Sequence, residues 1–384
     1  MNIRNYTGGL LASAALIGSA QAAPVTYSFT KIASTNDGYT FLDNTASINN
    51  NGEVAFWARP EGISEGIIYV YRGGGIQEVV PASGIIDSPS INDDGVVAYR
   101  AFLSGGGQAI NKSDGTTVTE VANTTGVFRD FDNYAMINND GLVAFSGRSD
   151  TGERFLYVGD GETISEIPDS SSAYAYGAGT SINDNGEVAF FGFLTDGGEV
   201  IGVSDGSATR TVVVATGNDR VNGLPVINDH GDVAFVKWSN VNNKRAILFS
   251  DGTTTQELIN TDYGFLSLGG LSINNSGDVA FRGTLASNMR SINVISDGLL
   301  NEVIRTGDVL SGLVITTLNI GHQALNDSNS LVFSARFSDG SVGIYRADVN
   351  GVSEVPLPAA LPLFLAGLAG LGAARRRKRG TNAA

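Results

Sequence analysis

Six basic residues of this chain recur near the end of the same segment of an internal repeat, and their chemistry is that of anion binding. Each comes at the end of a short apolar segment: Arg59, Arg100, Arg148, Lys237, Arg282 and Arg336. Aromatic residues accompany them, at Trp57, Phe102, Phe193 and Trp238. Guanidinium groups bind carboxylates through paired hydrogen bonds and stack on aromatic faces. One hypothesis is therefore a basic, aromatic-lined mouth for an anionic saccharide or for an acidic loop of a partner protein. The alternative is that each cation pairs with a neighbouring carboxylate.

Nucleophilic catalysis has weaker support in the sequence. The pattern Gly-x-Ser-x-Gly occurs around Ser64 and Ser204, but a nucleophile elbow requires a strand, a sharp turn, a helix and an available histidine. Both serines lie in β-rich segments. The chain has two histidines, His230 in a predicted turn and His322 just before a predicted strand, and no cysteine. We therefore predict no catalytic residue, no cofactor and no transition-metal site.

Carboxylates could also serve in glycan cleavage or in calcium binding. An enzyme acting on extracellular glycans would need a converging carboxyl pair, and carboxylates stand in predicted loops at Asp150, Asp196 and Glu199. Calcium loops need acidic ligands at fixed spacing. The repeated turns carry Asp at one position in four copies but Asn in three, so they predict turn chemistry and no metal.

The element that must position these residues is a sequence unit that occurs seven times. It reads Ile-Asn-x-x-Gly-x-Val-Ala-Phe, from Ile48 in the first copy to Leu325 in the last, with starts 43 to 52 residues apart. Such a period is typical of one four-stranded propeller blade, and seven blades are a common number for a closed ring. Only Asn329 replaces the turn glycine, which indicates a left-handed backbone there. The predicted turn residues, with the leading asparagine capping each turn, are Asn49, Gly52, Asn92, Gly95, Asn138, Gly141, Asn183, Gly186, Asn228, Gly231, Asn274, Gly277, Asn326 and Asn329.

A second turn signal completes each blade. Asp-Gly, Asn-Gly or Gly-Gly follows between two β-rich segments, as at Asp251-Gly252, and this is a strong hairpin signal. In the first copy we expect strands ending at Ile48 and over 53–58, 66–72 and 76–82. The fold class is therefore all-β, a seven-bladed β-propeller with four-stranded antiparallel blades over residues 23–355. Residues 26–32 resemble a fourth strand and are expected to close the ring, in competition with residues 351–355.

Both ends of the chain carry export signals. Arg4, the apolar segment 10–17 and the small residues Ala20 and Ala22 predict a signal peptide over residues 1–22, cleaved after Ala22. Without the leader and the tail, the body keeps 18 of the 24 basic residues and all 39 acidic ones, a net charge of −21. Such a body repels nucleic acid and anionic lipid. With no cysteine in the chain, the fold depends on apolar packing without disulfides.

The C-terminal segment 356–384 combines three features in order. A short proline motif consists of Val355, Pro356, Leu357, Pro358 and Ala359, and the apolar run extends to Ala374. Sixteen apolar residues span ~24 Å as a helix, against ~30 Å of hydrocarbon, so the run predicts a short transmembrane helix. The basic cluster that follows belongs on the cytoplasmic side and consists of Arg375, Arg376, Arg377, Lys378 and Arg379.

This tail resembles the PEP-CTERM family in its Val-Pro-Leu-Pro-Ala variant, with Leu357 where the family's namesake motif has Glu. The resemblance implies recognition and cleavage by an exosortase-type sorting enzyme, transient anchoring in the inner membrane, and release to the cell surface or extracellular space. The body resembles tandem Asn-x-x-Gly-x-x-Ala-Phe repeats of exported proteins. Together these features predict a non-enzymatic surface or matrix protein that binds an extracellular polysaccharide or another surface protein. A glycan-acting propeller enzyme and a purely structural surface protein are the alternatives.

Overall fold

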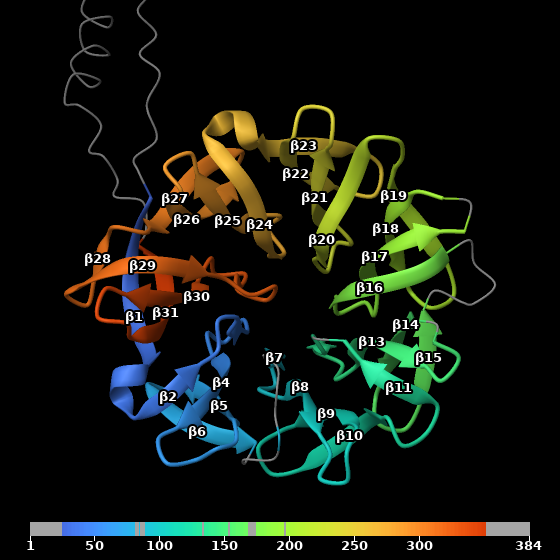
Figure 1. The fold of residues 1–384 in the computed structure, drawn as a ribbon, viewed down its shortest axis with the longest axis horizontal. Helices are drawn as coiled ribbons and strands as arrows, with labels where there is room; N and C mark the ends of the chain where they lie inside the picture. Colours follow the sequence, from blue (N-terminus) through green and yellow to red (C-terminus); the bar gives the residue numbers. More distant parts are fainter. Residues whose placement is uncertain are drawn as a thin grey trace, which may run out of the picture. The chain divides into compact units, whose positions relative to one another are not determined.

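Seven small antiparallel sheets form a ring in the computed structural model (Figure 1). The structure describes residues 25–80, 84, 89–132, 134–152, 154–167, 174–195 and 197–350, and the ring itself comprises Thr26–Val349. The predicted signal peptide, the sorting tail and residues 351–355 lie outside the described residues. In blades 2 and 4 to 6 the first strand lies nearest the centre of the ring and the last lies at the rim (Figure 1). The predicted seven-bladed all-β propeller is confirmed.

The first three blades have short or interrupted inner strands. In blade 1, β2 (Tyr39–Leu42) and β3 (Ser47–Ile48) both pair with β4 (Val54–Pro60), followed by β5 (Ile67–Arg72) and β6 (Gly75–Val80). Blade 2 consists of β7 (Ser90–Ile91), β8 (Val97–Phe102), β9 (Gln108–Ser113) and β10 (Val118–Asn123). In blade 3, β11 (Phe128–Phe131) and β12 (Met136–Ile137) pair with β13 (Val143–Ser149), followed by β14 (Arg154–Gly159) and β15 (Ile164–Ile167).

Blades 4 to 6 have continuous inner strands of nine residues. Blade 4 consists of β16 (Tyr174–Ile182), β17 (Val188–Leu194), β18 (Glu199–Ser204) and β19 (Thr209–Ala215). Blade 5 consists of β20 (Asp219–Ile227), β21 (Val233–Ser239), β22 (Lys244–Ser250) and β23 (Thr255–Asn260). Blade 6 consists of β24 (Phe265–Ile273), β25 (Val279–Leu285), β26 (Arg290–Ser296) and β27 (Leu299–Arg305).

Blade 7 contains both ends of the ring. It is built from β28 (Val309–Leu310), β29 (Leu313–Asn319), β30 (Leu331–Phe337) and β31 (Val342–Asn350), and β1 (Thr26–Ser34) pairs with β31 as the outer strand. The prediction that residues 26–32 close the ring is confirmed. Because the N-terminal strand completes the last sheet, β31 is not an unpaired edge.

The repeated turns have the predicted geometry. The turn glycines have φ between 73° and 79°, and Asn329 has φ 58°. Each leading asparagine caps its own turn, as Asn49 does when its Oδ1 accepts the main-chain N–H of Glu53 at 2.9 Å. After each turn one aromatic ring is fully buried between blades: Phe56, Tyr99, Phe145, Phe190, Phe235, Phe281 and Phe333. Each buried ring stabilises the fold by roughly 1.5–3 kcal/mol.

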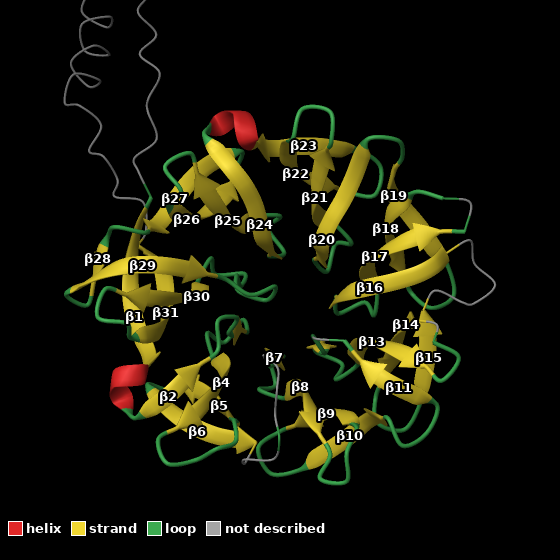
Figure 2. Cartoon of the chain, in the orientation of Figure 1, coloured by secondary structure: helices red, strands yellow, loops and turns green. Residues whose placement is uncertain are grey.

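Two single-turn 3-10 helices interrupt the β structure and were not predicted: η1 (Thr35–Asp37) and η2 (Thr261–Tyr263) (Figure 2). Ser34 and Asn260 cap their N-termini, and each helix ends at a glycine in the left-handed region. Along the described ranges, no helix has the length and apolarity to cross a membrane.

Candidate functional site

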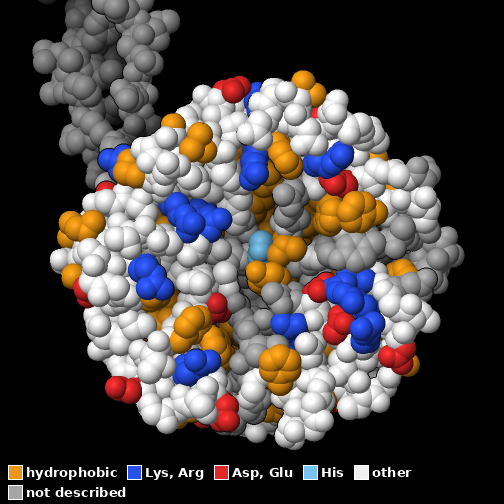
Figure 3. All heavy atoms as spheres, viewed as in Figure 1, with side chains coloured by type: hydrophobic (Ala, Val, Ile, Leu, Met, Phe, Trp, Pro, Cys, Tyr) orange, Lys and Arg blue, Asp and Glu red, His pale blue; other side chains and the backbone are white. Residues whose placement is uncertain are grey.

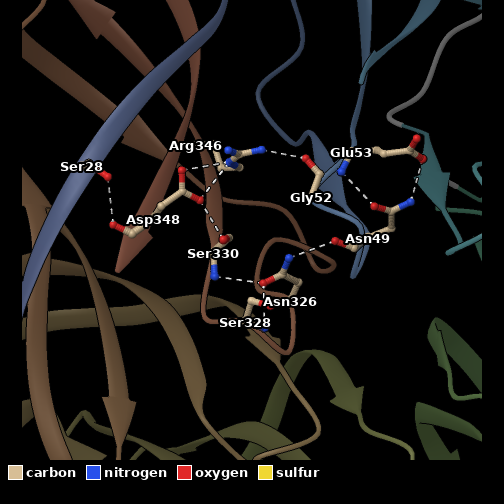
Figure 4. A network of polar contacts seen from close by, with 9 residues as sticks. All are labelled: Ser28, Asn49, Gly52, Glu53, Asn326, Ser328, Ser330, Arg346 and Asp348. Atoms are coloured by element: carbon tan, nitrogen blue, oxygen red, sulfur yellow. Dashed lines mark hydrogen bonds and ion pairs between the residues drawn. The ribbon is translucent and has the colours of Figure 1, made fainter. Parts of the chain in front are cut away.

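The seven leading asparagines of the turns form a closed circle of hydrogen bonds around the central channel. Each side-chain Nδ2 donates to the main-chain carbonyl of the leading asparagine in the next blade, over distances of 2.9–3.2 Å. Asn326 of blade 7 donates to Asn49 of blade 1, and beside it Arg346 donates to the carbonyl of Gly52 at 2.9 Å (Figure 4). The turn asparagines are therefore structural links between blades.

A second circle lies beside the first. The residue after each leading asparagine accepts, through Oδ1, the main-chain N–H of its counterpart in the preceding blade. The members alternate between amide and carboxylate, in the order Asn50, Asp93, Asn139, Asp184, Asp229, Asn275 and Asp327. Alternation fails once in a ring of seven, and the two adjacent carboxylates are Asp184 and Asp229. Burial, followed by the charge of Asp229, raises the pKa of Asp184 against the hydrogen bonds from Asn139.

The six predicted binding cations do not share one site. Arg148 pairs with Asp130 at 3.6 Å and Lys237 with Asp219 at 2.8 Å. Arg100 donates to the main-chain carbonyl of Phe131, and Arg336 to that of Gly340. The Arg59 guanidinium lies 5.7 Å from the centre of the Trp57 ring. Basic side chains accordingly form separate patches on the face in Figure 3, two of which lie beside acidic groups.

The structure instead brings together Trp238, Arg245 and Arg282 in a groove of about 300 Å³ between blades 5 and 6. Trp238 comes from β21, Arg245 from β22 and Arg282 from β25. The groove is also lined by Ser267, by residues 268–271 of β24 and by His322 at its inner end. None of the described residues that line it is acidic. The groove therefore carries positive charge, although the body as a whole has a net charge of −21.

Arg245 holds the outer part of this groove in place. Its guanidinium lies 5.4 Å from the centre of the Trp238 ring, a cation–π contact. The same guanidinium donates to Ser267 Oγ at 3.1 Å, and the indole N–H of Trp238 donates to Asn243 Oδ1 at 3.0 Å. The Arg245 guanidinium and the Trp238 indole N–H therefore both have hydrogen-bond partners, which fix the two side chains before a ligand binds. Arg245 is not one of the six repeated cations, and the sequence analysis missed it.

His322 lies where the groove meets the central channel. Its ring makes an edge-on contact with Tyr134, with 5.2 Å between ring centres. Burial lowers the pKa of His322 to about 4, so the imidazole is neutral at pH 7. Among the described residues its buried Nδ1 has no hydrogen-bond partner. The other histidine, His230, is an exposed turn residue.

The residues considered for catalysis do not converge. Ser64 is exposed, and Ser204 is the buried last residue of β18, where its hydroxyl donates to the main-chain carbonyl of Ala208. Glu199 forms an ion pair with Arg220 at 3.5 Å. Asp150 is exposed, and Asp196 lies outside the described residues. Within the described part of the chain, no three His, Cys, Asp or Glu side chains are grouped to hold a metal.

Solved propellers share this architecture at low sequence identity. Oligogalacturonate lyase from Vibrio parahaemolyticus is 13% identical with a TM-score of 0.56, over 86% of this chain and 99% of that one. The β-propeller domain of the Trilobed protease from Pyrococcus furiosus is 12% identical with a TM-score of 0.56, over 83% and 99%. A puromycin-hydrolyzing peptidase from Mycobacterium tuberculosis is 16% identical with a TM-score of 0.54, over 88% of this chain and 58% of that one. The likeness shows the propeller fold alone.

No curated protein matches the sequence significantly. One family does match, in three overlapping and staggered segments, 18–215, 70–313 and 199–348, as expected when a repeated unit aligns in more than one register. Because these segments cover most of the chain, it belongs to the family of unknown function DUF7453.

Proposed function

We propose that this protein is an exported, non-enzymatic binding protein that takes a saccharide in the groove between blades 5 and 6. The observation that carries the proposal is the contact of Arg245 with Trp238 in a groove whose described lining residues include no acidic side chain. Aromatic rings offer apolar surface to the C–H groups of a sugar, and arginine supplies several hydrogen-bond donors to its oxygens. A groove of about 300 Å³ is at the small end of ligand sites.

The floor of the groove suits close approach of a ligand. A β-carbon at Gly269 would meet no atom within 4 Å, so the space above this residue is open. Gly270 has φ 63°, and a β-carbon there would press on Ile320 at 3.3 Å. Main-chain polar groups are therefore reachable at a place where larger residues would fill the groove.

Export and sorting form the second part of the proposal. The signal peptide over residues 1–22 directs the body out of the cytoplasm, and the Val-Pro-Leu-Pro-Ala motif with its apolar run and basic cluster is the substrate of an exosortase-type enzyme. These sequence motifs support it. Intact mass of the protein from culture supernatant and from membranes tests it, because both ends are expected to be absent from the released form. Recovery of the complete chain from the supernatant would contradict sorting.

Trp238→Ala tests the binding site, and Trp57→Ala is the matched control. Trp57 also lies under an arginine but packs against Gly66, where a β-carbon would overlap its ring, and it does not line the groove. On a glycan array the first variant is expected to lose binding and the second to keep it. Equal binding by both variants would overturn the groove as the site. A reducing-sugar assay on the bound glycans reports cleavage, and cleavage would overturn the non-enzymatic part.

A further inference from the structure

The geometry points to an oxyanion subsite beside the groove, formed by Arg282, which lines the groove, and by its neighbour Arg290, that selects acidic saccharides. This inference rests on the proposed saccharide site and adds its ligand class, a sugar that bears a carboxylate or a sulfate ester. The two arginines come from neighbouring strands of blade 6, and a third residue, Asn319, comes from β29 of blade 7.

Strand register places the two guanidinium groups on one face. In the ladder of β25 and β26, Arg290 stands opposite Thr284, two residues from Arg282. Residues two apart on a strand face the same side, so Arg282 and Arg290 are diagonal neighbours within reach of each other. Both donate to the same atom, Asn319 Oδ1, at 2.6 Å from Arg282 and 3.4 Å from Arg290. Two positive groups therefore share one neutral acceptor.

Neither arginine has a carboxylate partner among the described residues, whereas Arg148 and Lys237 each have one. Burial, followed by the charge of Arg290, lowers the pKa of Arg282. Both guanidinium groups nevertheless stay charged at neutral pH. Two cations held together and partly desolvated without an anion are costly, and a bound oxyanion would offset that cost. The wider body offers many carboxylates, so their absence at this point is a specific feature of the site.

Arg282 also connects this subsite to the sugar groove. It lines the groove with Trp238 and Arg245, and its Cβ lies 3.7 Å from the position a β-carbon would take at Gly270. A saccharide that stacks on Trp238 would therefore extend its acidic substituent along β24 toward Arg282 and Arg290. Arginine forks match the two oxygens of a carboxylate, and they also bind tetrahedral oxyanions.

The test is calorimetric titration of the full chain with three oligosaccharides of equal length: neutral, uronic and sulfated. Arg282→Gln with Arg290→Gln is the test variant, and Arg59→Gln is the control, because Arg59 lies on the equivalent strand of blade 1, outside the groove. We expect the double variant to bind the acidic ligands about tenfold or more weakly, since hydrogen bonds to charged groups are the strong ones. Binding of the neutral ligand is expected to stay unchanged. Which acidic ligand loses more distinguishes the carboxylate from the sulfate ester.

The outcomes separate the two proposals. If wild-type protein binds acidic and neutral ligands equally and the double variant does the same, the oxyanion subsite is wrong and the saccharide groove stands. If Trp238→Ala leaves all three ligands bound, the groove is wrong and the subsite falls with it. Binding of an acidic peptide in place of every saccharide would overturn the ligand class. Circular dichroism of each variant checks that the propeller is intact.

Discussion

The side-chain amide of Gln323 pairs with the main chain of Ile91, 232 residues earlier in the sequence. Its Nε2 donates to the carbonyl of Ile91 at 2.7 Å and its Oε1 accepts the N–H of Ile91 at 3.1 Å. The main-chain carbonyl of Gln323 accepts the N–H of Ile48 at 2.8 Å. Gln323 of blade 7 therefore provides hydrogen-bond partners for main-chain groups in the innermost strands of blades 1 and 2. Ser90 of blade 2 has the corresponding role for blade 3, because its Oγ accepts the N–H of Ile137.

Replacement of Gln323 by Ala is expected to destabilise the propeller by ~1–3 kcal/mol, the cost of leaving buried main-chain polar groups unsatisfied. Urea unfolding measures the change in the free energy of unfolding. The control is Gln256→Ala, since Gln256 is exposed on an outer strand, and it is expected to stay within about 0.5 kcal/mol of wild type. Equal stabilities of the two variants would show that Gln323 does not hold the ring closed.

The ring could be predicted because its signals are local. A glycine with positive φ and an asparagine cap specify each turn whatever surrounds them, and counting the turns gives the number of blades. The closing strand was predicted in the same way, from its likeness to other outer strands. The 3-10 helices were missed because their caps, Ser34 and Asn260, lie outside the repeated unit.

The groove could not be predicted, since it depends on contacts between strands of different blades. Six cations lie near the end of the second strand of their blades, but their surroundings differ: Lys237 pairs with Asp219, and Arg282 donates to Asn319. Arg245 and Arg290 each stand at or near the start of the third strand of their blade. A comparison of the repeats at that position would have drawn attention to both residues.

Asn329→Gly is expected to destabilise the protein, although glycine adopts the observed φ of 58° more readily. The structure adds a second role for this side chain, since its Oδ1 accepts from Asn274 and its Nδ2 donates to Asp278 Oδ2, both at 2.8 Å. Loss of two partly buried hydrogen bonds costs about 1 kcal/mol each and outweighs the relief of strain. Thermal unfolding compares this variant with Gly277→Ala, where the strain alone is expected to lower stability. A more stable Asn329→Gly protein would contradict the second role.

Asp229→Asn is expected to destabilise the protein less than Asp93→Asn at pH 7, because Asp229 Oδ2 accepts from one asparagine, Asn275, and Asp93 Oδ2 from two. Asp93 Oδ2 accepts from Asn50 and Asn139 on its two sides, so an amide there loses acceptors and destabilises the circle. Asp229 adjoins Asp184, and an amide at 229 removes the like charge. The pKa of Asp184 is raised in the folded state. Its contribution to stability is therefore present below the unfolded pKa and is lost as pH rises through the folded pKa. Asp229→Asn should lower the pKa of Asp184 and reduce this loss.

Carboxyl titration by NMR and unfolding at several pH values measure both effects. Asp93 lies across Asn139 from Asp184, and its charge also raises the pKa of Asp184. The other charged or titratable groups around these turns are Glu187, Asp232, Arg210, His230 and, on the channel wall, His322. His230→Gln serves as the control, because His230 follows Asp229 directly in the same turn. An unchanged Asp184 titration in Asp229→Asn would show that the two carboxylates do not interact.

Removal of the closing strand is expected to expose the edge of β31 and to open the ring. A chain that begins at Thr35 lacks β1, whose Ile32 and Ala33 are buried in the last blade. An unpaired strand edge is a template for another chain, so the truncated protein should associate and lose its sharp unfolding transition. Adding a peptide of residues 26–34 in trans should restore a monomer by strand addition. The same peptide with Ile32→Asp and Ala33→Asp should fail, because it cannot bury these charges. Size-exclusion chromatography with light scattering follows the association, and a truncated chain that stays monomeric and equally stable would mean that the ring holds without β1.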